Sequence, residues 1–375
     1  MSNPMDIAMS PIYKDYVDGI HPYKPGKPIR EVERELGLRH VVKLASNENP
    51  LGPSHKALRA MRRAIREAHL YPEGSSHYLV RRLSQDLGVP PEQILIGNGS
   101  NEILELLARG FLSPGDRILT SESSFLVYPI LAQACGAEFT TVPMKDFRYD
   151  LDGILKAITD KTRIIFIANP NNPTGTYVTA AEVTAFLAKV PPEVIVCLDE
   201  AYVDFVDAQD FPMMMEEIRR DRPNLILMRT FSKSYGLAGL RVGYAVACAR
   251  MIGYLHKIRQ PFNVNLVAQA AATAALDDRF FLWRTKHCVT WGRKFFYKRF
   301  REMGLRFLES QGNFVLVDTG RDADEVFKAL LSRGMIVRSM KEYGLPSWIR
   351  VSIGRRSQNT LFVRLLKECL SSKGA

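Results

Sequence analysis

The chain has 375 residues, of which 46% are hydrophobic and 24% are charged, and its formal net charge is +11. This length predicts one large and one smaller domain, and the composition is typical of a globular protein. Five widely separated cysteines without a CxxC pair argue against a disulfide framework and a zinc site. The chain shows neither a signal-peptide pattern nor a run of about 18 apolar residues. We therefore expect a soluble, cytoplasmic protein that spans no membrane.

The N-terminal segment, residues 1–35, contains HPYKPGKPIRE and is rich in proline and glycine. It predicts an extended arm with little structure of its own. The later segment SHKALRAMRRAIREAH predicts a helix. Its apolar face would carry Ala57, Leu58, Met61 and Ile65, and its arginines would fill the opposite face.

Short apolar segments alternate with helical ones in the next part of the chain. We expect strands at 93–97, 117–121, 163–169, 193–199, 225–230 and 241–247, and helices such as the one at 101–112. Wholly apolar strands predict a mostly parallel sheet that helices cover on both faces, which is an α/β architecture. Ligands bind such sheets beyond the carboxyl ends of the strands.

The pattern changes near residue 277. A long helix to about residue 303, the strands NFVLVD, MIVRSM and WIRVSIG, and a helix in DADEVFKALLSRG predict a small α+β domain. We expect an N-terminal arm and the start of the small domain at 1–40, a large ligand-binding domain at 41–276 and the C-terminal small domain at 277–375.

Basic residues cluster in the expected long helix. Between residues 284 and 302 the only carboxylate is Glu302, whereas seven residues are basic: Arg284, Lys286, Arg293, Lys294, Lys298, Arg299 and Arg301. A basic helix can bind nucleic acid. No nucleic-acid-binding motif accompanies this one, so we favour a solvated helix face and expect no nucleic-acid partner. A basic balance also suits an anionic small substrate.

Polar groups follow the expected strands. After 93–97, GNGSNE leads into a helix, so the backbone amides at Ser100 and Asn101 could form a phosphate cup. A simple helix cap at either residue is the alternative. After 163–169, NPNNPTG predicts a rigid turn whose Asn172 amide could donate to an oxyanion.

The next two strands end in ionisable groups. Asp199 follows five apolar residues, and a carboxylate buried there needs a cation or a donor. Tyr202 comes three residues later, and TFSK supplies Lys233 just past the following strand. A metal ion could neutralise Asp199, but no histidine cluster or second acidic cluster lies nearby, so we expect no metal.

A phosphate cup, an amide, a carboxylate, a phenol and a lysine on one rim suit pyridoxal phosphate. The lysine amine forms a Schiff base with the aldehyde. The carboxylate keeps the pyridine nitrogen protonated, so the ring can accept electrons. The residues thus favour a pyridoxal-phosphate site.

Five motifs carry a family resemblance. They are SNENPLGPS (46–54), YPEGSSHYLVRRL (71–83), NPNNPTG (169–175), DEAYVDF (199–205) and SKSYGLAGLRVGY (232–244). In their order and spacing, the chain resembles the fold-type I pyridoxal-phosphate aminotransferases, in the branch that contains the histidinol-phosphate aminotransferases. The resemblance covers nearly the whole chain.

The resemblance implies roles at the cofactor. Lys233 would be the Schiff-base lysine and the acid/base, and Asp199 would pair with the pyridinium nitrogen. Asn172 and Tyr202 would hold the phenolic oxygen, and Phe125 would stack on the ring. The phosphate would be held by the backbone amides of Ser100 and Asn101 and by Thr230, Ser232 and Arg241.

The resemblance also implies a homodimer with shared active sites, in which Tyr71 would reach the neighbouring subunit's phosphate. Arg350 would grip the substrate carboxylate, which suits a guanidinium fork. Tyr23, Asn47 and Arg338 would line the substrate pocket, and in this branch Tyr23 and both arginines contact the substrate phosphate. An ordinary turn at Tyr71 and a surface ion pair at Arg338 stay open.

Two departures leave the substrate open. Ser123, Ser124 and Phe125 stand where relatives often have proline, threonine and tyrosine, and Asn101 stands where they often have aspartate. The implied reaction is transamination of histidinol phosphate with 2-oxoglutarate, in histidine biosynthesis. Transamination of aromatic amino acids is the runner-up, followed by threonine-phosphate decarboxylation. A regulator's effector domain is disfavoured, because only about 35 residues precede the core.

Overall fold

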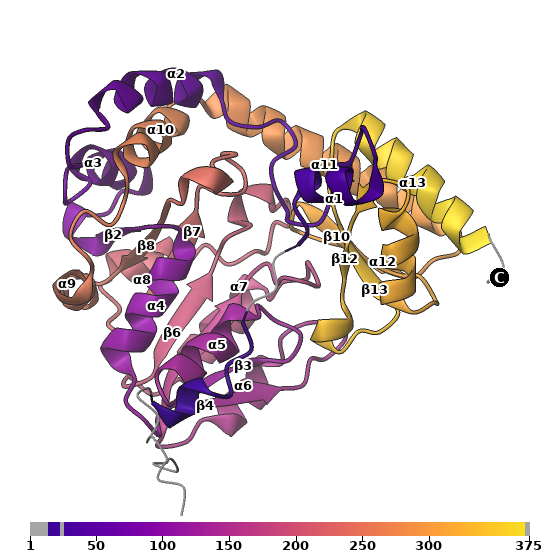
Figure 1. Ribbon diagram of the computed structural model, residues 1–375. Helices are drawn as coiled ribbons and strands as arrows, with labels where there is room; N and C mark the ends of the chain where they lie inside the picture. Colours follow the sequence, from indigo (N-terminus) through magenta and orange to yellow (C-terminus); the bar gives the residue numbers. More distant parts are fainter. Residues whose placement is uncertain (1–13, 23–25, 372–375) are drawn as a thin grey trace, which may run out of the picture.

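The computed structural model describes residues 14–22 and 26–371, and a seven-stranded sheet forms the centre of its larger part (Figure 1). The strand order is β2-β8-β7-β6-β5-β3-β4. The strands are β2 (Ile94–Gly97), β3 (Arg117–Ser121), β4 (Glu138–Val142), β5 (Thr162–Ala168), β6 (Ile195–Asp199), β7 (Leu225–Thr230) and β8 (Gly243–Ala247). β8 runs antiparallel to β2 and β7, and the other neighbouring pairs of this sheet are parallel, so the expected mostly parallel sheet is confirmed.

Helices cover both faces of this sheet because successive side chains of each buried strand point to opposite sides. In β5, Ile164 and Phe166 join one apolar core, and Ile165 and Ile167 join the other. The first core includes α4 (Ser100–Phe111), α5 (Val127–Ala134) and α9 (Ala249–Ile258). The second includes α3 (His77–Leu87), α6 (Leu151–Ala157), α7 (Ala180–Leu187), α8 (Met215–Arg219) and α10 (Leu266–Leu276).

A smaller antiparallel sheet has the order β12-β13-β10-β9. Its strands are β9 (Phe307–Leu308), β10 (Phe314–Asp318), β12 (Arg338–Ser339) and β13 (Trp348–Ser352). Around it lie α11 (Arg279–Glu302), α12 (Ala323–Leu331) and α13 (Arg356–Ser371), and α11 reaches it from beside the large sheet (Figure 1). A separate parallel pair joins β1 (Val42–Lys43) to β11 (Met335–Ile336), which places the SNENP segment between the two sheets.

Three local expectations are corrected. Residues 1–35 are not a wholly extended arm, since α1 (Ile29–Leu36) is a helix that begins after Pro28 and buries Val32. The edge strand β4 was not expected, because EFTTV is polar and only partly buried. The helix α2 (His55–Ala64) ends before Ile65, which is 63% exposed, whereas Ala64 is buried.

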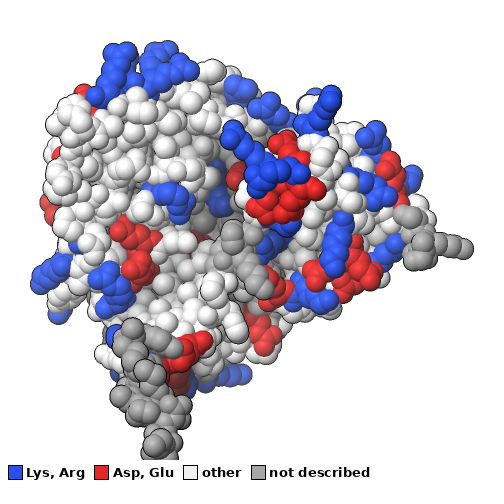
Figure 2. Space-filling model, viewed as in Figure 1, with Lys and Arg blue, Asp and Glu red and all other residues white. Residues whose placement is uncertain are grey.

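Figure 2 shows basic side chains gathered over α2, which agrees with the expected solvent-facing arginines. Short 3-10 turns complete the described chain: η1 (Asp15–Val17), η2 (Ile65–Glu67), η3 (Pro91–Gln93), η4 (Val203–Phe205), η5 (Ala238–Leu240) and η6 (Lys341–Tyr343). Among the described residues, no helix combines the length and apolar character that crossing a membrane requires.

Candidate active site

A cavity of about 370 Å³ lies at the carboxyl ends of the large sheet's strands, where side chains of the small sheet also reach it. The predicted site residues that line it are Asn47, Ser100, Asn101, Phe125, Asn172, Asp199, Tyr202, Thr230, Ser232, Lys233, Arg241, Arg338 and Arg350. Tyr23 lies outside the described residues. Tyr71 is 82% exposed and stacks on Phe262 at 4.8 Å, away from this chain's cavity. Its role toward a neighbouring subunit stays a prediction.

One end of the cavity is built to receive an anion. The helix α4 begins after Gly99, whose φ is 78°, and no side chain caps it. The alternative of a cap at Ser100 or Asn101 is therefore wrong. Arg241 crosses this end and its Nη1 lies 3.4 Å from Ser232 Oγ. A Cβ on Gly99 would displace the Arg241 guanidinium, and the positive φ of Gly99 favours glycine at this turn.

Lys233 is half-buried beside this anion end. Its Nζ donates to the Ser46 carbonyl oxygen at 3.2 Å and lies 5.7 Å from the centre of the Tyr202 ring. Burial, assisted by the positive charges of Arg350 and Arg241, lowers the pKa of Lys233 to about 8. The amine is therefore neutral, and able to attack a carbonyl, far more often than a surface lysine is.

Asp199 ends β6 and is buried. Its Oδ1 accepts the Ala201 amide at 3.1 Å, and its Oδ2 accepts the Tyr128 hydroxyl at 3.1 Å. Burial raises the pKa of this carboxyl to about 6 in spite of both donors. A cation placed against Asp199 would reverse that shift, which is the environment that a protonated pyridine nitrogen provides.

A hydrogen-bonded chain joins the two sheets across the cavity. Asn47 Nδ2 donates to the Tyr202 hydroxyl oxygen at 3.0 Å, and Asn47 Oδ1 accepts the Ser352 hydroxyl at 2.9 Å. Arg350 donates through Nη1 to Asn172 Oδ1 and through Nη2 to the Ala45 carbonyl at 2.7 Å. Because Asn172 Oδ1 is occupied, its Nδ2 group is the part that can serve a ligand.

Arg350 keeps one donor unused. Its side chain is buried, yet its Nε has no hydrogen-bond partner within the described part of the chain. A buried unsatisfied donor costs about 1–3 kcal/mol, so an anionic ligand that accepted this N–H would recover that energy. Arg350 is therefore a buried positive charge in the cavity wall, which suits an anionic ligand.

The sequence left two interpretations of Arg338 open, a pocket residue and a surface ion pair, and both describe it. It lines the cavity, and its Nη2 also lies 3.0 Å from the Glu342 carboxylate on η6. The same turn brings Tyr343 to the cavity wall, where its backbone carbonyl accepts the Ser123 hydroxyl at 2.8 Å. Tyr343, and Tyr128 behind Asp199, were not among the residues predicted from the sequence.

Comparison with known proteins identifies the family. Residues 39–366 match the family described as aminotransferase class I and II. The chain belongs to this family. The aminotransferase is 47% identical to histidinol-phosphate aminotransferase from Moorella thermoacetica, over 97% of this chain and 95% of that relative. It is 50% identical to histidinol-phosphate aminotransferase 1 from Cupriavidus pinatubonensis, over 96% and 97% of the two chains.

A solved structure gives the same result. Histidinol-phosphate aminotransferase from Sinorhizobium meliloti in complex with pyridoxal-5′-phosphate superposes with a TM-score of 0.88 at 30% identity, covering 96% of this aminotransferase and 98% of that chain. The expected fold and enzyme class, a pyridoxal-phosphate-dependent aminotransferase, are confirmed. The cavity suits that cofactor on its own chemistry, because it combines an uncapped helix N-terminus, a poised lysine and a buried carboxylate.

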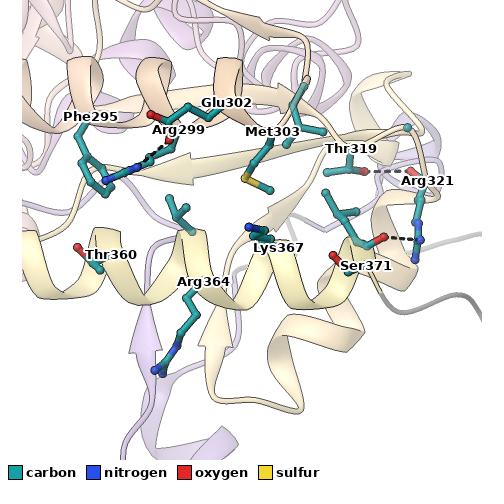
Figure 3. A pocket seen from close by; sticks show the side chains of 14 residues that line it. Phe295, Arg299, Glu302, Met303, Thr319, Arg321, Thr360, Arg364, Lys367 and Ser371 are labelled. Atoms are coloured by element: carbon teal, nitrogen blue, oxygen red, sulfur yellow. Dashed lines mark hydrogen bonds and ion pairs between the residues drawn. The ribbon is translucent and has the colours of Figure 1, made fainter.

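A second cavity lies in the small domain of the aminotransferase, between α11 and α13, and its volume is about 730 Å³ (Figure 3). Arg299 in its wall is already paired with Glu302 at 2.7 Å, and Arg321 donates to the Leu370 carbonyl at 2.7 Å. Arg364 points away from the cavity in Figure 3. We call this cavity the small-domain groove.

Proposed function

We propose that this aminotransferase transfers the amino group of histidinol phosphate to 2-oxoglutarate, a step of histidine biosynthesis. Relatives that carry the name histidinol-phosphate aminotransferase, at 46–50% identity over nearly the whole chain, support this substrate. The observation that carries it within the structure is that two guanidinium groups, those of Arg350 and Arg338, line one cavity. Two guanidinium groups suit a phosphate dianion.

The cavity residues would hold the cofactor in one orientation. The uncapped amides of α4 and the groups of Thr230, Ser232 and Arg241 would bind the phosphate. Asp199 would face the pyridine nitrogen at the opposite end. Phe125, which also lines the cavity, would contact the ring face.

The phenolic oxygen of the cofactor would meet two donors. Asn172 offers Nδ2, because its Oδ1 already accepts from Arg350. Burial raises the pKa of Tyr202 to about 12, so this phenol keeps its proton and can donate it. Bound pyridoxal phosphate supplies an electron sink that stabilises a carbanion at the substrate Cα.

Lys233 would do two things in the reaction. Its neutral amine would anchor the cofactor aldehyde, and after the substrate amine replaced it, the freed amine would take the Cα proton. Positioned general bases contribute about 10²–10⁴-fold to such proton transfers. A pKa near 8 suits this work near neutral pH, because the amine can both accept and return a proton.

Arg350 and Arg338 would serve both half-reactions. Histidinol phosphate has no carboxylate, so the arginines would bind its phosphate. Glutamate and 2-oxoglutarate would present carboxylates to the same guanidinium groups. Arg338 is paired with Glu342, and an incoming dianion would compete for that ion pair.

A steady-state comparison of histidinol phosphate, phenylalanine and tyrosine, each with 2-oxoglutarate, tests the substrate. We expect the highest kcat/KM for histidinol phosphate. In the Arg338→Ala variant, KM should rise about tenfold or more for histidinol phosphate and much less for phenylalanine, which lacks the phosphate. A wild-type kcat/KM that is higher for phenylalanine would assign the enzyme to aromatic amino acids instead.

We also propose a cytoplasmic homodimer in which Tyr71 contacts the neighbouring subunit's cofactor phosphate. The contact across the dimer is supported by the exposure of Tyr71 and of its apolar neighbours Leu70 and Phe262. The five cysteines are free, which suits a reducing compartment. Analytical ultracentrifugation should give twice the chain mass, and Tyr71→Phe should weaken pyridoxal-phosphate binding without dissociating the dimer. A monomer with full activity would contradict this assembly.

A further inference from the structure

Tyr128 is a buried phenol directly behind the cofactor-facing end of β6. It is the second residue of α5, and its side chain is fully removed from solvent. Its ring stacks on Phe166 of β5, with centroids 4.5 Å apart and an interplanar angle of 10°. It also meets Phe125 edge-on at 5.6 Å. The ring is therefore fixed from two sides, and its hydroxyl can reach few partners.

That hydroxyl points at Asp199. The distance from Tyr128 Oη to Asp199 Oδ2 is 3.1 Å, and the other oxygen, Oδ1, accepts the Ala201 amide. Burial, with the nearby Asp199 charge, raises the pKa of Tyr128 well above its ordinary value. The phenol therefore keeps its proton and is the donor in this hydrogen bond.

We propose that Tyr128 is a positioning residue, which holds the Asp199 carboxylate ionised and turned toward the pyridine nitrogen of bound pyridoxal phosphate. The inference rests on the proposed function, in which Asp199 faces that nitrogen. A hydrogen bond to a charged group is stronger than one between neutral groups, and a fixed donor also limits rotation of the carboxylate.

The physical consequence is a change in where one proton resides. With the Tyr128 donor, Asp199 would be held as a carboxylate that can pair with a protonated pyridine nitrogen. Without it, the Asp199 carboxylate would be less stabilised and would take up the proton more readily. Bound pyridoxal phosphate would then supply a weaker electron sink, and the Lys233 nitrogen bonded to it would be more basic.

The variant Tyr128→Phe isolates the hydroxyl, because phenylalanine preserves the contacts with Phe166 and Phe125. The pH midpoint of the cofactor's visible absorption in the holoenzyme should rise by about one unit. The dissociation constant of pyridoxal phosphate from the reconstituted apoenzyme should increase roughly tenfold. The kcat should fall while KM changes little, since the effect lies in the electron sink and not in the substrate pocket.

Tyr177→Phe is the matched control. The Tyr177 hydroxyl donates to Asp210 Oδ1 at 2.7 Å, so the variant also removes a phenol-to-aspartate hydrogen bond, but outside the cavity. Both variants should lower Tm modestly, and only Tyr128→Phe should move the absorption midpoint. A purely structural role for Tyr128 would lower Tm with an unchanged midpoint, and that result would overturn the proposal.

A double-mutant comparison with Asp199→Asn separates this inference from the proposed function. If Asp199→Asn binds pyridoxal phosphate as tightly as the wild type, the proposed placement of the cofactor fails. If Asp199→Asn weakens binding and Tyr128→Phe has no effect, only the role of Tyr128 fails. If Tyr128 acts through Asp199, adding Tyr128→Phe to Asp199→Asn should shift the midpoint by less than about 0.3 pH unit and change the affinity by less than twofold.

Discussion

The two cavities of the molecule differ in size and in chemistry. The small-domain groove encloses about 730 Å³, roughly twice the 370 Å³ at the ends of the large sheet's strands. In the groove, Arg299 has a neighbouring carboxylate and Arg321 hydrogen-bonds to backbone carbonyls. In the smaller cavity, Lys233 and Asp199 have pKa values shifted toward neutrality, and Arg350 retains an unused donor.

The difference shows which property marks a catalytic site. Volume alone does not mark a catalytic site, because a groove between two surface helices can be large while its polar groups already have partners. Buried polar groups that converge on one space without full partners indicate a ligand, since their desolvation is otherwise uncompensated. The substitutions below test this contrast between the two cavities.

Lys233→Ala should have the largest effect. Removal of the amine should lower kcat by at least about 10²–10⁴-fold, because no other group would move the Cα proton. Steady-state assays with histidinol phosphate and 2-oxoglutarate measure this loss. Lys367→Ala, at a lysine that lines the small-domain groove, is the matched control and should retain wild-type turnover. Normal turnover by Lys233→Ala, without added amine, would exclude Lys233 as the catalytic base.

Arg350→Lys should have the next largest effect. Lysine keeps the positive charge but loses the planar fork and the Nε donor, so KM should rise about 10–100-fold for every anionic substrate. Kinetics with histidinol phosphate and with 2-oxoglutarate should show the rise in both half-reactions. Arg364→Lys in the small-domain groove is the control. An unchanged KM for both substrates in Arg350→Lys would mean that the unused donor faces no substrate.

Lowering the pH should have an intermediate effect on the rate at which the apoenzyme captures its cofactor. Only a neutral amine attacks an aldehyde, so the rate at which apoenzyme captures pyridoxal phosphate should fall about tenfold per pH unit below pH 8 and level off above it. Absorbance recorded from about pH 6 to about pH 10 measures this rate. A rate that still rises steeply at pH 10 would indicate a lysine with the ordinary pKa of 10.5.

Substitutions in the small-domain groove should have the smallest effect on kcat/KM. Leu370→Ser introduces a polar group where the groove is apolar, and Lys367→Glu reverses a charge in its wall. Neither should alter kcat/KM by as much as twofold, because neither residue lines the catalytic cavity. A tenfold change in kcat/KM by Lys367→Glu would reveal communication between the two cavities.

The sequence alone was sufficient to predict where the buried strands end and which site residues follow them. Asp199 and Lys233 could be predicted because parallel strands bring their carboxyl ends to one edge. Tyr128 and Tyr343 could not, since Tyr343 reaches the cavity from η6 and Tyr128 contacts Asp199 from α5, behind the cavity wall. How closely those elements approach depends on tertiary packing, and Tyr128 was hidden in a run of apolar residues.

The fold could be predicted in its layers but not at its margins. Buried strands such as β5 and β6 are wholly apolar and were found, whereas the polar edge strand β4 was missed. Prolines suggested an extended N-terminal segment, but Pro28 lies just before α1, where proline costs the helix no hydrogen bond. The residues of α1 are mostly good helix formers, and the helix buries Val32.

Covalent trapping tests the central claim most directly. The enzyme is incubated with pyridoxal phosphate, reduced with borohydride and digested, and the modified peptide is identified by mass spectrometry. We expect a reduced cofactor adduct on Lys233 at one per chain and none on Lys367 in the small-domain groove. An adduct at another lysine with Lys233 unmodified would contradict the assignment of the smaller cavity as the active site.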